Sequence, residues 1–161
     1  MVFDPVLATG GGDSLASEDP VAALAPLFEL ATVITPNRIE ADRLCGAQIG
    51  PEQQAALLLE RGCRHALLKG GHGPEPDEVV NRWISRDRQR NWRWPRLPGE
   101  FHGSGCTLAA ALSALLAQGM DMEPAIDAAQ TYCQQTLAAS YAIAAGQRIP
   151  SRTLPFLKLR G

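Results

Sequence analysis

The stretch Gly103-Ser104-Gly105-Cys106-Thr107 leads into an apolar run over 108–117 that consists mostly of alanine and leucine. These are strong helix formers, so the glycines are predicted to lie at the N-terminus of a helix. The first backbone N–H groups of a helix have no partner within it, and the helix dipole places partial positive charge there. A glycine-rich turn at this position can therefore bind an anion such as a phosphate group.

Cys106 falls in the first turn of this predicted helix, where the positive field favours a thiolate over a thiol. Backbone donors in such a turn can stabilise the charge that develops on a phosphoryl group during transfer, while a nearby base accepts a hydroxyl proton. The alternative is a glycine turn that only starts a core helix with a buried cysteine. Short glycine motifs are common in unrelated proteins, so the turn by itself leaves both interpretations open.

Composition limits the classes of protein that need to be considered. With 161 residues, 45% of them hydrophobic, the chain is long enough for a core and is predicted to form a single domain over 1–161. A net charge of −2 gives no electrostatic reason to expect nucleic acid or a membrane surface as a partner, and no apolar run is long enough to span a bilayer. The N-terminus has no basic signal region. The four cysteines form no CxxC pair, so we expect reduced thiols in a cytoplasmic protein: Cys45, Cys63, Cys106 and Cys133.

Short apolar segments alternate with helix-like segments in the first part of the chain. Val2-Phe3, the run 31–35 and the run 65–69 predict buried strands. Helices are predicted from Asp19 to about Leu30, from Asn37 onward and from Pro51 to Arg61. The segment 78–94 predicts a hairpin that turns near 86–88, and a long helix is predicted from Met122 to about Ala145, ended by Gly146. This order predicts an α/β fold with a mostly parallel sheet flanked by helices.

Three polar positions follow the predicted strands, where open α/β sheets bind their ligands. Asp4 ends the first strand, and Asn37 and Glu40 stand three residues apart after the second. Asn37 and Glu40 either form a capping box at a helix start, or present Glu40 to the waters of a Mg²⁺ ion. Lys69 precedes Gly70-Gly71 and either reaches a phosphate group or remains a solvated lysine before a loop.

Other features have weaker interpretations. Gly10-Gly11-Gly12 with Asp13 predicts a flexible loop that could also approach a ligand. His72 has no partner at metal-ligand spacing and is interpreted as a polar loop residue. Arginines and tryptophans alternate in the hairpin, as they do on some nucleic-acid-binding surfaces, but solvated strands commonly have the same pattern.

Four segments together resemble the ribokinase-like small-molecule kinases, and in particular the hydroxymethylpyrimidine/phosphomethylpyrimidine kinases of thiamine biosynthesis. They occur in the order of that family and cover almost the whole chain. The segments are Asp4-Pro5-Val6, Ile34-Thr35-Pro36-Asn37-Arg38-Ile39-Glu40-Ala41, Leu68-Lys69-Gly70-Gly71-His72 and His102-Gly103-Ser104-Gly105-Cys106-Thr107-Leu108.

The resemblance implies ATP and Mg²⁺ as cofactors and assigns a role to each matching position. Glu40 is implied to act through Mg²⁺ and its waters, with Asn37 beside the phosphates and Lys69 and Asp4 near the triphosphate and metal. The turn Gly103-Ser104-Gly105 is implied to form the anion hole, and Cys106 stands where most ribokinase relatives have an aspartate base. Gly71 and Thr107, from the same segments, are assigned to nucleotide binding.

The implied substrate is 4-amino-5-hydroxymethyl-2-methylpyrimidine or its monophosphate. A pyridoxal kinase, or a nucleotide-binding module without catalysis, are the alternatives. Complete family members carry a substantial portion before the Asp-Pro-Val segment, including a glycine-rich substrate loop that this chain lacks. An incomplete sheet would also expose an unpaired edge. We therefore expect a fragment whose N-terminal part a longer chain supplies, or a chain that needs a partner such as a second copy of itself.

Overall fold

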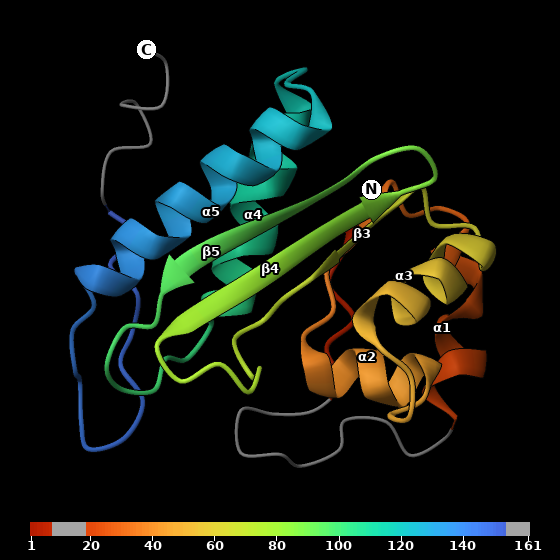
Figure 1. Ribbon diagram of the computed structural model, residues 1–161. Helices are drawn as coiled ribbons and strands as arrows, with labels where there is room; N and C mark the ends of the chain where they lie inside the picture. Colours follow the sequence, from red (N-terminus) through yellow and green to blue (C-terminus); the bar gives the residue numbers. More distant parts are fainter. Residues whose placement is uncertain (8–18, 154–161) are drawn as a thin grey trace. The chain divides into compact units, whose positions relative to one another are not determined.

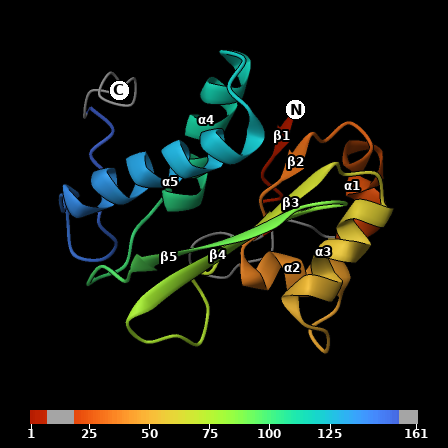
Figure 2. The ribbon, with the colours of Figure 1, turned by 45° about the horizontal axis from the view of Figure 1, so that its top comes forward.

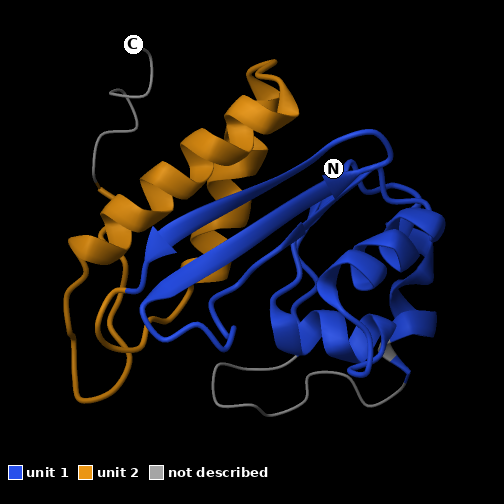
Figure 3. Cartoon of the chain, viewed as in Figure 1, with its two compact units in different colours: residues 1–96 blue, residues 97–161 orange. Residues whose placement is uncertain are grey.

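The computed structural model describes residues 1–7 and 19–153, and the chain divides into two compact units (Figure 3). Unit 1 is Met1–Arg96 and unit 2 is Leu97–Gly161. Unit 1 contains β1 (Val2–Phe3), α1 (Pro20–Phe28), β2 (Val33–Ile34), α2 (Arg38–Cys45), α3 (Pro51–Glu60), β3 (His65–Leu68), β4 (Glu78–Ser85) and β5 (Gln89–Pro95). Unit 2 contains α4 (Ser104–Ala117) and α5 (Met122–Ala138). The assignment of all 161 residues to a single domain stays a prediction.

The sheet of unit 1 has the strand order β1-β2-β3-β4-β5 (Figure 2). The first three strands are parallel, with Val33 of β2 opposite Val2 of β1 and His65 of β3. β4 is antiparallel to both β3 and β5. The predicted α/β fold is confirmed, but the sheet is mixed rather than mostly parallel. Parallel neighbours require a long crossover, and only a helix-free loop separates β3 from β4.

The core of unit 1 lies between the sheet and the helices α1, α2 and α3, which share one side of the sheet (Figures 1 and 2). Alternate strand residues point to this side, since side chains of a strand alternate between faces. The buried residues of this core come from each of the three parallel strands and each of the three helices, and they include Phe3, Ile34, Ala66, Phe28, Leu44 and Leu58. The rings of Phe3 and Phe28 meet edge to face at 5.9 Å between centroids, which ties β1 to the end of α1.

Helix starts and the hairpin follow the sequence prediction closely. The Asp19 side chain accepts a hydrogen bond of 2.9 Å from the Val21 N–H at the start of α1. Strands β4 and β5 pair along their whole lengths and turn at 86–88, as predicted. The predicted loop Gly10-Gly11-Gly12 with Asp13 lies outside the described residues.

In unit 2, α4 and α5 pack against one another through apolar faces that include Leu112 and Ile126. The prediction that α5 continues to about Ala145 is wrong, because the helix ends at Ala138. The chain instead turns back, and the backbones of Tyr141 and Ile149 exchange two hydrogen bonds. Arg148 also donates to the Ser140 hydroxyl at 2.8 Å, which holds this return in place.

No helix in the described part of the chain is both long and apolar enough to cross a bilayer.

Candidate functional site

Asp4, Thr35 and Lys69 meet at the carboxyl ends of the three parallel strands of unit 1. One carboxylate oxygen of Asp4, Oδ1, accepts from the Lys69 ammonium at 2.7 Å and from the Thr35 hydroxyl at 2.9 Å. The Lys69 and Asp4 side chains are only 11% and 16% exposed. This ion pair is therefore shielded from solvent, and the cation stays within reach of a ligand at the sheet edge.

Asn37 and Glu40 form the predicted capping box at the start of α2. The Asn37 side chain accepts from the Glu40 N–H at 2.9 Å, and Glu40 Oε2 accepts from the Asn37 N–H at 2.7 Å. The helix-capping interpretation is thus confirmed. It does not exclude a ligand role, because an ionised carboxylate has about four acceptor sites and the capping bond uses one of them.

The backbone brings this helix start beside the end of β3. Asn37 and Lys69 form a parallel β-bridge, and the Lys69 N–H donates to the Pro36 carbonyl at 2.8 Å. Because this bridge extends the β2–β3 pairing, α2 begins where the Asp4–Lys69 pair lies. The four sheet-edge residues chosen from the sequence are therefore neighbours: Asp4, Asn37, Glu40 and Lys69.

Electrostatics link Glu40 to the ion pair. Glu40 is 6% exposed, and this burial raises the pKa of its carboxyl group above the usual value. Two effects oppose this rise, since the positive charge of Lys69 and the hydrogen bond from the Asn37 backbone both lower the pKa of Glu40. The negative charge of Asp4 raises it further. The two acidic groups thus repel one another across a lysine, and a cation placed there would relieve that repulsion.

The residues at this edge suit a magnesium ion that is bound together with phosphate groups. Mg²⁺ usually keeps several waters and takes one or two carboxylates plus substrate oxygens. Asp4 and Glu40 can supply two carboxylates, and within 1–7 and 19–153 no cluster of three His, Cys, Asp or Glu residues forms a complete metal cage. Their role toward a metal stays a prediction.

Gly70 and Gly71 follow Lys69 and differ in their surroundings. A Cβ on Gly70 would lie 2.2 Å from the Val80 carbonyl oxygen, whereas a Cβ on Gly71 would meet nothing within 4 Å. The Gly70 N–H also donates to the buried Asn81 side chain at 2.8 Å. Gly70 therefore allows the end of β3 to lie against β4, and Gly71 is exposed at the sheet edge, where its predicted nucleotide contact stays a prediction.

In unit 2, the predicted glycine turn forms the N-terminus of α4, as expected from the sequence. Gly103 is the N-cap, with a left-handed φ of 76° that favours glycine, and no side chain caps the helix. The turn residues that follow are the first four residues of α4: Ser104, Gly105, Cys106 and Thr107. Backbone N–H groups at such a terminus have no partner in the helix, which is the property that an anion site needs.

The turn is braced by one of its own side chains, Thr107, and by two from outside it, Arg152 and Cys133. The Thr107 hydroxyl donates to the Gly103 carbonyl at 2.8 Å and accepts from Arg152 Nε at 2.9 Å. The Cys133 thiol of α5 donates to the Ser104 carbonyl at 3.5 Å. Thr107 is 3% exposed, so its side chain supports the turn, while the nucleotide contact assigned to it stays a prediction.

Cys106 is an exposed free thiol, in contrast to the buried thiols of Cys63 and Cys133. The interpretation of a core cysteine at this position is therefore wrong. The reason is geometric: Cys106 lies in the first turn, and the buried stripe of α4 begins with Thr107 and Leu108. An exposed thiol at a helix N-terminus is accessible to a substrate hydroxyl.

Two contributors were not found from the sequence. Thr35 could have been suspected, since it is a polar residue that follows a buried strand inside a motif already singled out. Arg152 lies 45 residues from Thr107 and is preceded by no recognisable pattern. Only the folded chain brings it to the turn.

Comparisons with known proteins identify relatives of this chain. The family model described as phosphomethylpyrimidine kinase matches residues 1–151. The hydroxymethylpyrimidine/phosphomethylpyrimidine kinase of Rhizobium meliloti is 35% identical, over 91% of this chain and 57% of its own length. A thiamine biosynthesis bifunctional protein of Geobacter sulfurreducens is 40% identical, over 82% of this chain and 28% of that protein.

Solved structures give the same fold. The pyridoxal kinase of Staphylococcus aureus in complex with ADP superposes with a TM-score of 0.83 at 24% identity, covering 94% of this chain and 57% of that one. A protein of Bacteroides thetaiotaomicron that is described as a phosphomethylpyrimidine kinase superposes with a TM-score of 0.71 at 23% identity, covering 86% of this chain and 51% of that one. The chain thus spans little more than half the length of these proteins. The match over residues 1–151 confirms the resemblance inferred from the four motifs, and the chain belongs to the phosphomethylpyrimidine kinase family.

Proposed function

We propose that this chain carries the nucleotide-binding and phosphoryl-transfer part of an ATP-dependent kinase of thiamine biosynthesis. Its substrate is 4-amino-5-hydroxymethyl-2-methylpyrimidine, the monophosphate of that compound, or both. The family match over residues 1–151 carries this proposal, and the names of the 35% identical relative and its homologues point to the substrate. The sheet edge and the glycine turn offer the chemistry that such a kinase requires.

The sheet-edge residues suit the triphosphate of ATP. Lys69 is a point charge that can neutralise phosphate oxygens, and Asn37 lies beside it. Asp4 and Glu40 would hold Mg²⁺ directly or through its waters. When bound, the metal supplies positive charge to the β- and γ-phosphate oxygens.

The glycine turn suits the transfer step. The backbone N–H groups of the first turn of α4 stabilise negative charge on the γ-phosphoryl group as it moves. Cys106, as a thiolate, accepts the proton of the substrate hydroxyl or phosphate oxygen. That oxygen bonds to the γ-phosphorus as the bond from phosphorus to the bridging oxygen breaks, and ADP leaves with the electron pair.

ADP release from the purified chain tests this proposal. Mg·ATP is supplied with the hydroxymethylpyrimidine, its monophosphate or pyridoxal in parallel reactions. Cys106→Ala is expected to lower kcat by at least about 100-fold, the usual contribution of a general base. Cys45→Ala, which removes a half-buried thiol from α2, is the matched control and should retain turnover.

Specific outcomes would contradict the proposal. Full turnover in Cys106→Ala would show that this thiol is not the base. Turnover on pyridoxal alone would favour a pyridoxal kinase, the activity that names the similar Staphylococcus aureus structure. A folded wild-type chain that binds ATP without turnover on any alcohol would favour a nucleotide-binding module.

We further propose that a second copy of this chain or a longer chain completes the substrate side of the site. Sedimentation of the active species measures its mass and so the number and length of the chains in it.

A further inference from the structure

The β3–β4 loop, residues 69–77, is held by one arginine that follows β5 directly. The guanidinium of Arg96 donates to the Gly71 carbonyl at 2.8 Å, to the Glu75 carbonyl at 3.2 and 3.0 Å, and to the Glu78 carbonyl at 3.2 Å. The Arg96 N–H also donates to the Asp77 carbonyl at 2.9 Å. Both ends of the loop are therefore attached to one side chain.

The form of this contact suits a positioning role. A guanidinium presents five N–H donors in a rigid plane, so it can hold several carbonyl groups at fixed relative positions, which a lysine cannot do. All the acceptors are backbone carbonyl oxygens, so Arg96 restrains the backbone of the loop rather than the rotamer of a single side chain. Within the described residues, no carboxylate forms a salt bridge with Arg96, and its charge remains available to the loop.

The restrained loop carries the residues that are proposed to meet phosphate. Lys69 and Gly71 lie at its start, and Lys69 is also bonded to Asp4 at 2.7 Å. Burial lowers the pKa of His72 in this loop, and the positive charges of Lys69 and Arg96 lower it further. Lys69 and Arg96 are thus the two cations that the structure associates with the start of the loop.

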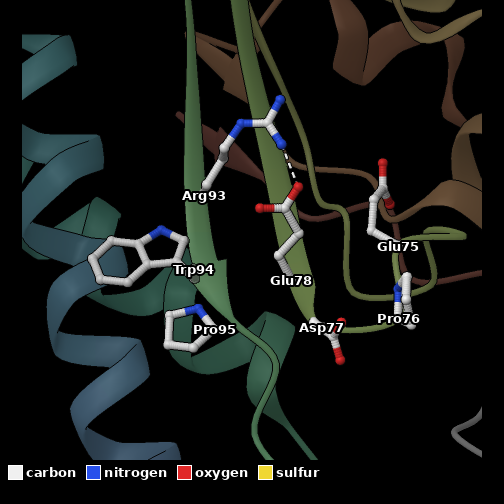
Figure 4. Close-up of a pocket in the computed structure, with 7 residues that line it drawn as sticks. All are labelled: Glu75, Pro76, Asp77, Glu78, Arg93, Trp94 and Pro95. Atoms are coloured by element: carbon white, nitrogen blue, oxygen red, sulfur yellow. Dashed lines mark hydrogen bonds and ion pairs between the residues drawn. The ribbon is translucent and has the colours of Figure 1, made fainter.

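The same loop also forms one side of an open pocket of about 480 Å³ (Figure 4). Its lining combines the end of the loop, the first residue of β4 and the end of β5: Glu75, Pro76, Asp77, Glu78, Arg93, Trp94 and Pro95. Arg96 follows this lining in the chain and joins its two sides through the carbonyls of Glu75 and Glu78. Without the Arg96 side chain, the loop would keep three backbone hydrogen bonds, Lys69 N–H to Pro36, Gly73 N–H to Gly70 and residue 96 N–H to Asp77, together with contacts of other side chains.

We propose that Arg96 is a positioning residue for nucleotide binding, because it fixes the β3–β4 loop so that Lys69 and Gly71 face a phosphate group. This inference rests on the proposed function. Arg96 itself contacts the loop and not the nucleotide. Its effect is on the fraction of molecules whose loop is ready to bind.

Hydrogen exchange and steady-state kinetics on the full chain test this proposal together. In Arg96→Ala, amide exchange over 69–77 should accelerate at least about tenfold, as expected when a local restraint is lost. If the binding-competent loop falls to about one tenth of the population, the KM for ATP rises about tenfold. kcat should stay within about twofold, since the loss acts on binding and not on the transition state alone.

Two further variants sharpen the test. Arg93→Ala removes an arginine of β5 that is ion-paired to the Glu78 side chain on the surface, and it should leave exchange and KM unchanged. Arg96→Lys keeps the positive charge but not the planar set of donors, so the amides of residues 69–77 should exchange faster in this variant than in the wild type. It also serves as the test variant if Arg96→Ala does not fold.

The proposal is overturned if exchange over 69–77 is the same in the wild type and the Arg96 variants. It is also overturned if the loop loosens and the KM for ATP does not change. A wild-type chain that binds no ATP contradicts the proposed function instead, and the exchange rates then still decide whether Arg96 fixes the loop.

Discussion

Replacing Gly70 by alanine should destabilise the chain far more than the same change at Gly71. The added methyl carbon would lie 2.2 Å from the Val80 oxygen, 2.7 Å from its carbonyl carbon and 2.8 Å from its nitrogen. All three are backbone atoms of β4, so no rotamer change can relieve the overlap. The end of β3 has to move away from β4 by about 1.3 Å to lengthen the 2.2 Å approach to an ordinary contact near 3.5 Å.

The cost of that movement follows from the contacts that it breaks. Overpacking a well-packed site costs about 1–3 kcal/mol. The movement also weakens the hydrogen bond from the Gly70 N–H to Asn81, whose side chain is buried, which adds about 1 kcal/mol. We therefore expect a loss of about 3 kcal/mol in the free energy of unfolding, or a fall of about 9 °C in Tm for a chain of this size.

Thermal and urea unfolding, followed by circular dichroism, measure this difference. Gly71→Ala is the control, because its Cβ meets nothing within 4 Å and its φ lies outside the left-handed region. That change should leave the free energy of unfolding within about 1 kcal/mol of the wild type, in either direction. Equal stability of the two variants would refute the assignment of Gly70 to the close approach of β3 and β4.

Two other predictions concern charges. In a double-mutant cycle of Asp4→Asn and Lys69→Met, each single change should lower the free energy of unfolding by about 2 kcal/mol. The coupling energy between the two changes should be at least about 1 kcal/mol, because both side chains are mostly buried. A coupling energy near zero would mean that solvent screens the ion pair. Desolvation lowers the pKa of His65, so the unfolded chain binds the proton first, and stability should fall as the pH drops through 6.5. In urea unfolding, the His65→Phe variant should lose less stability than the wild type between pH 7.5 and 5.5. An equal loss in both proteins would contradict the role of His65 in this pH dependence.

Local patterns were sufficient for the helix starts, the hairpin and the glycine turn. The capping box of Asn37 and Glu40 is determined by a spacing of three residues, which puts both partners on the same turn of a helix. The N-cap position of Gly103 follows from a glycine before a run of helix formers. These features depend on residues within a few positions of one another, and the sequence contains all of that information.

The end of α5 could not be predicted in this way. Its alanine-rich run reads as helix up to Gly146, but the chain turns back after Ala138. Pairing of Tyr141 with Ile149, and the bond from Arg148 to Ser140, compete successfully with weak helix propensity. Propensity is a small energy that tertiary contacts override.

By itself, the sequence determined the motifs from which we predict the residues of phosphoryl transfer, because residue type and short-range spacing are read directly from the chain. Only the tertiary structure decided which of them share one site. Asp4 meets Thr35 across 31 residues and Lys69 across 65, through the parallel register of β1, β2 and β3. Arg96 likewise meets Gly71 across 25 residues because β5 returns beside β4. Such contacts depend on strand pairing between distant segments, and no local pattern in the chain specifies that pairing.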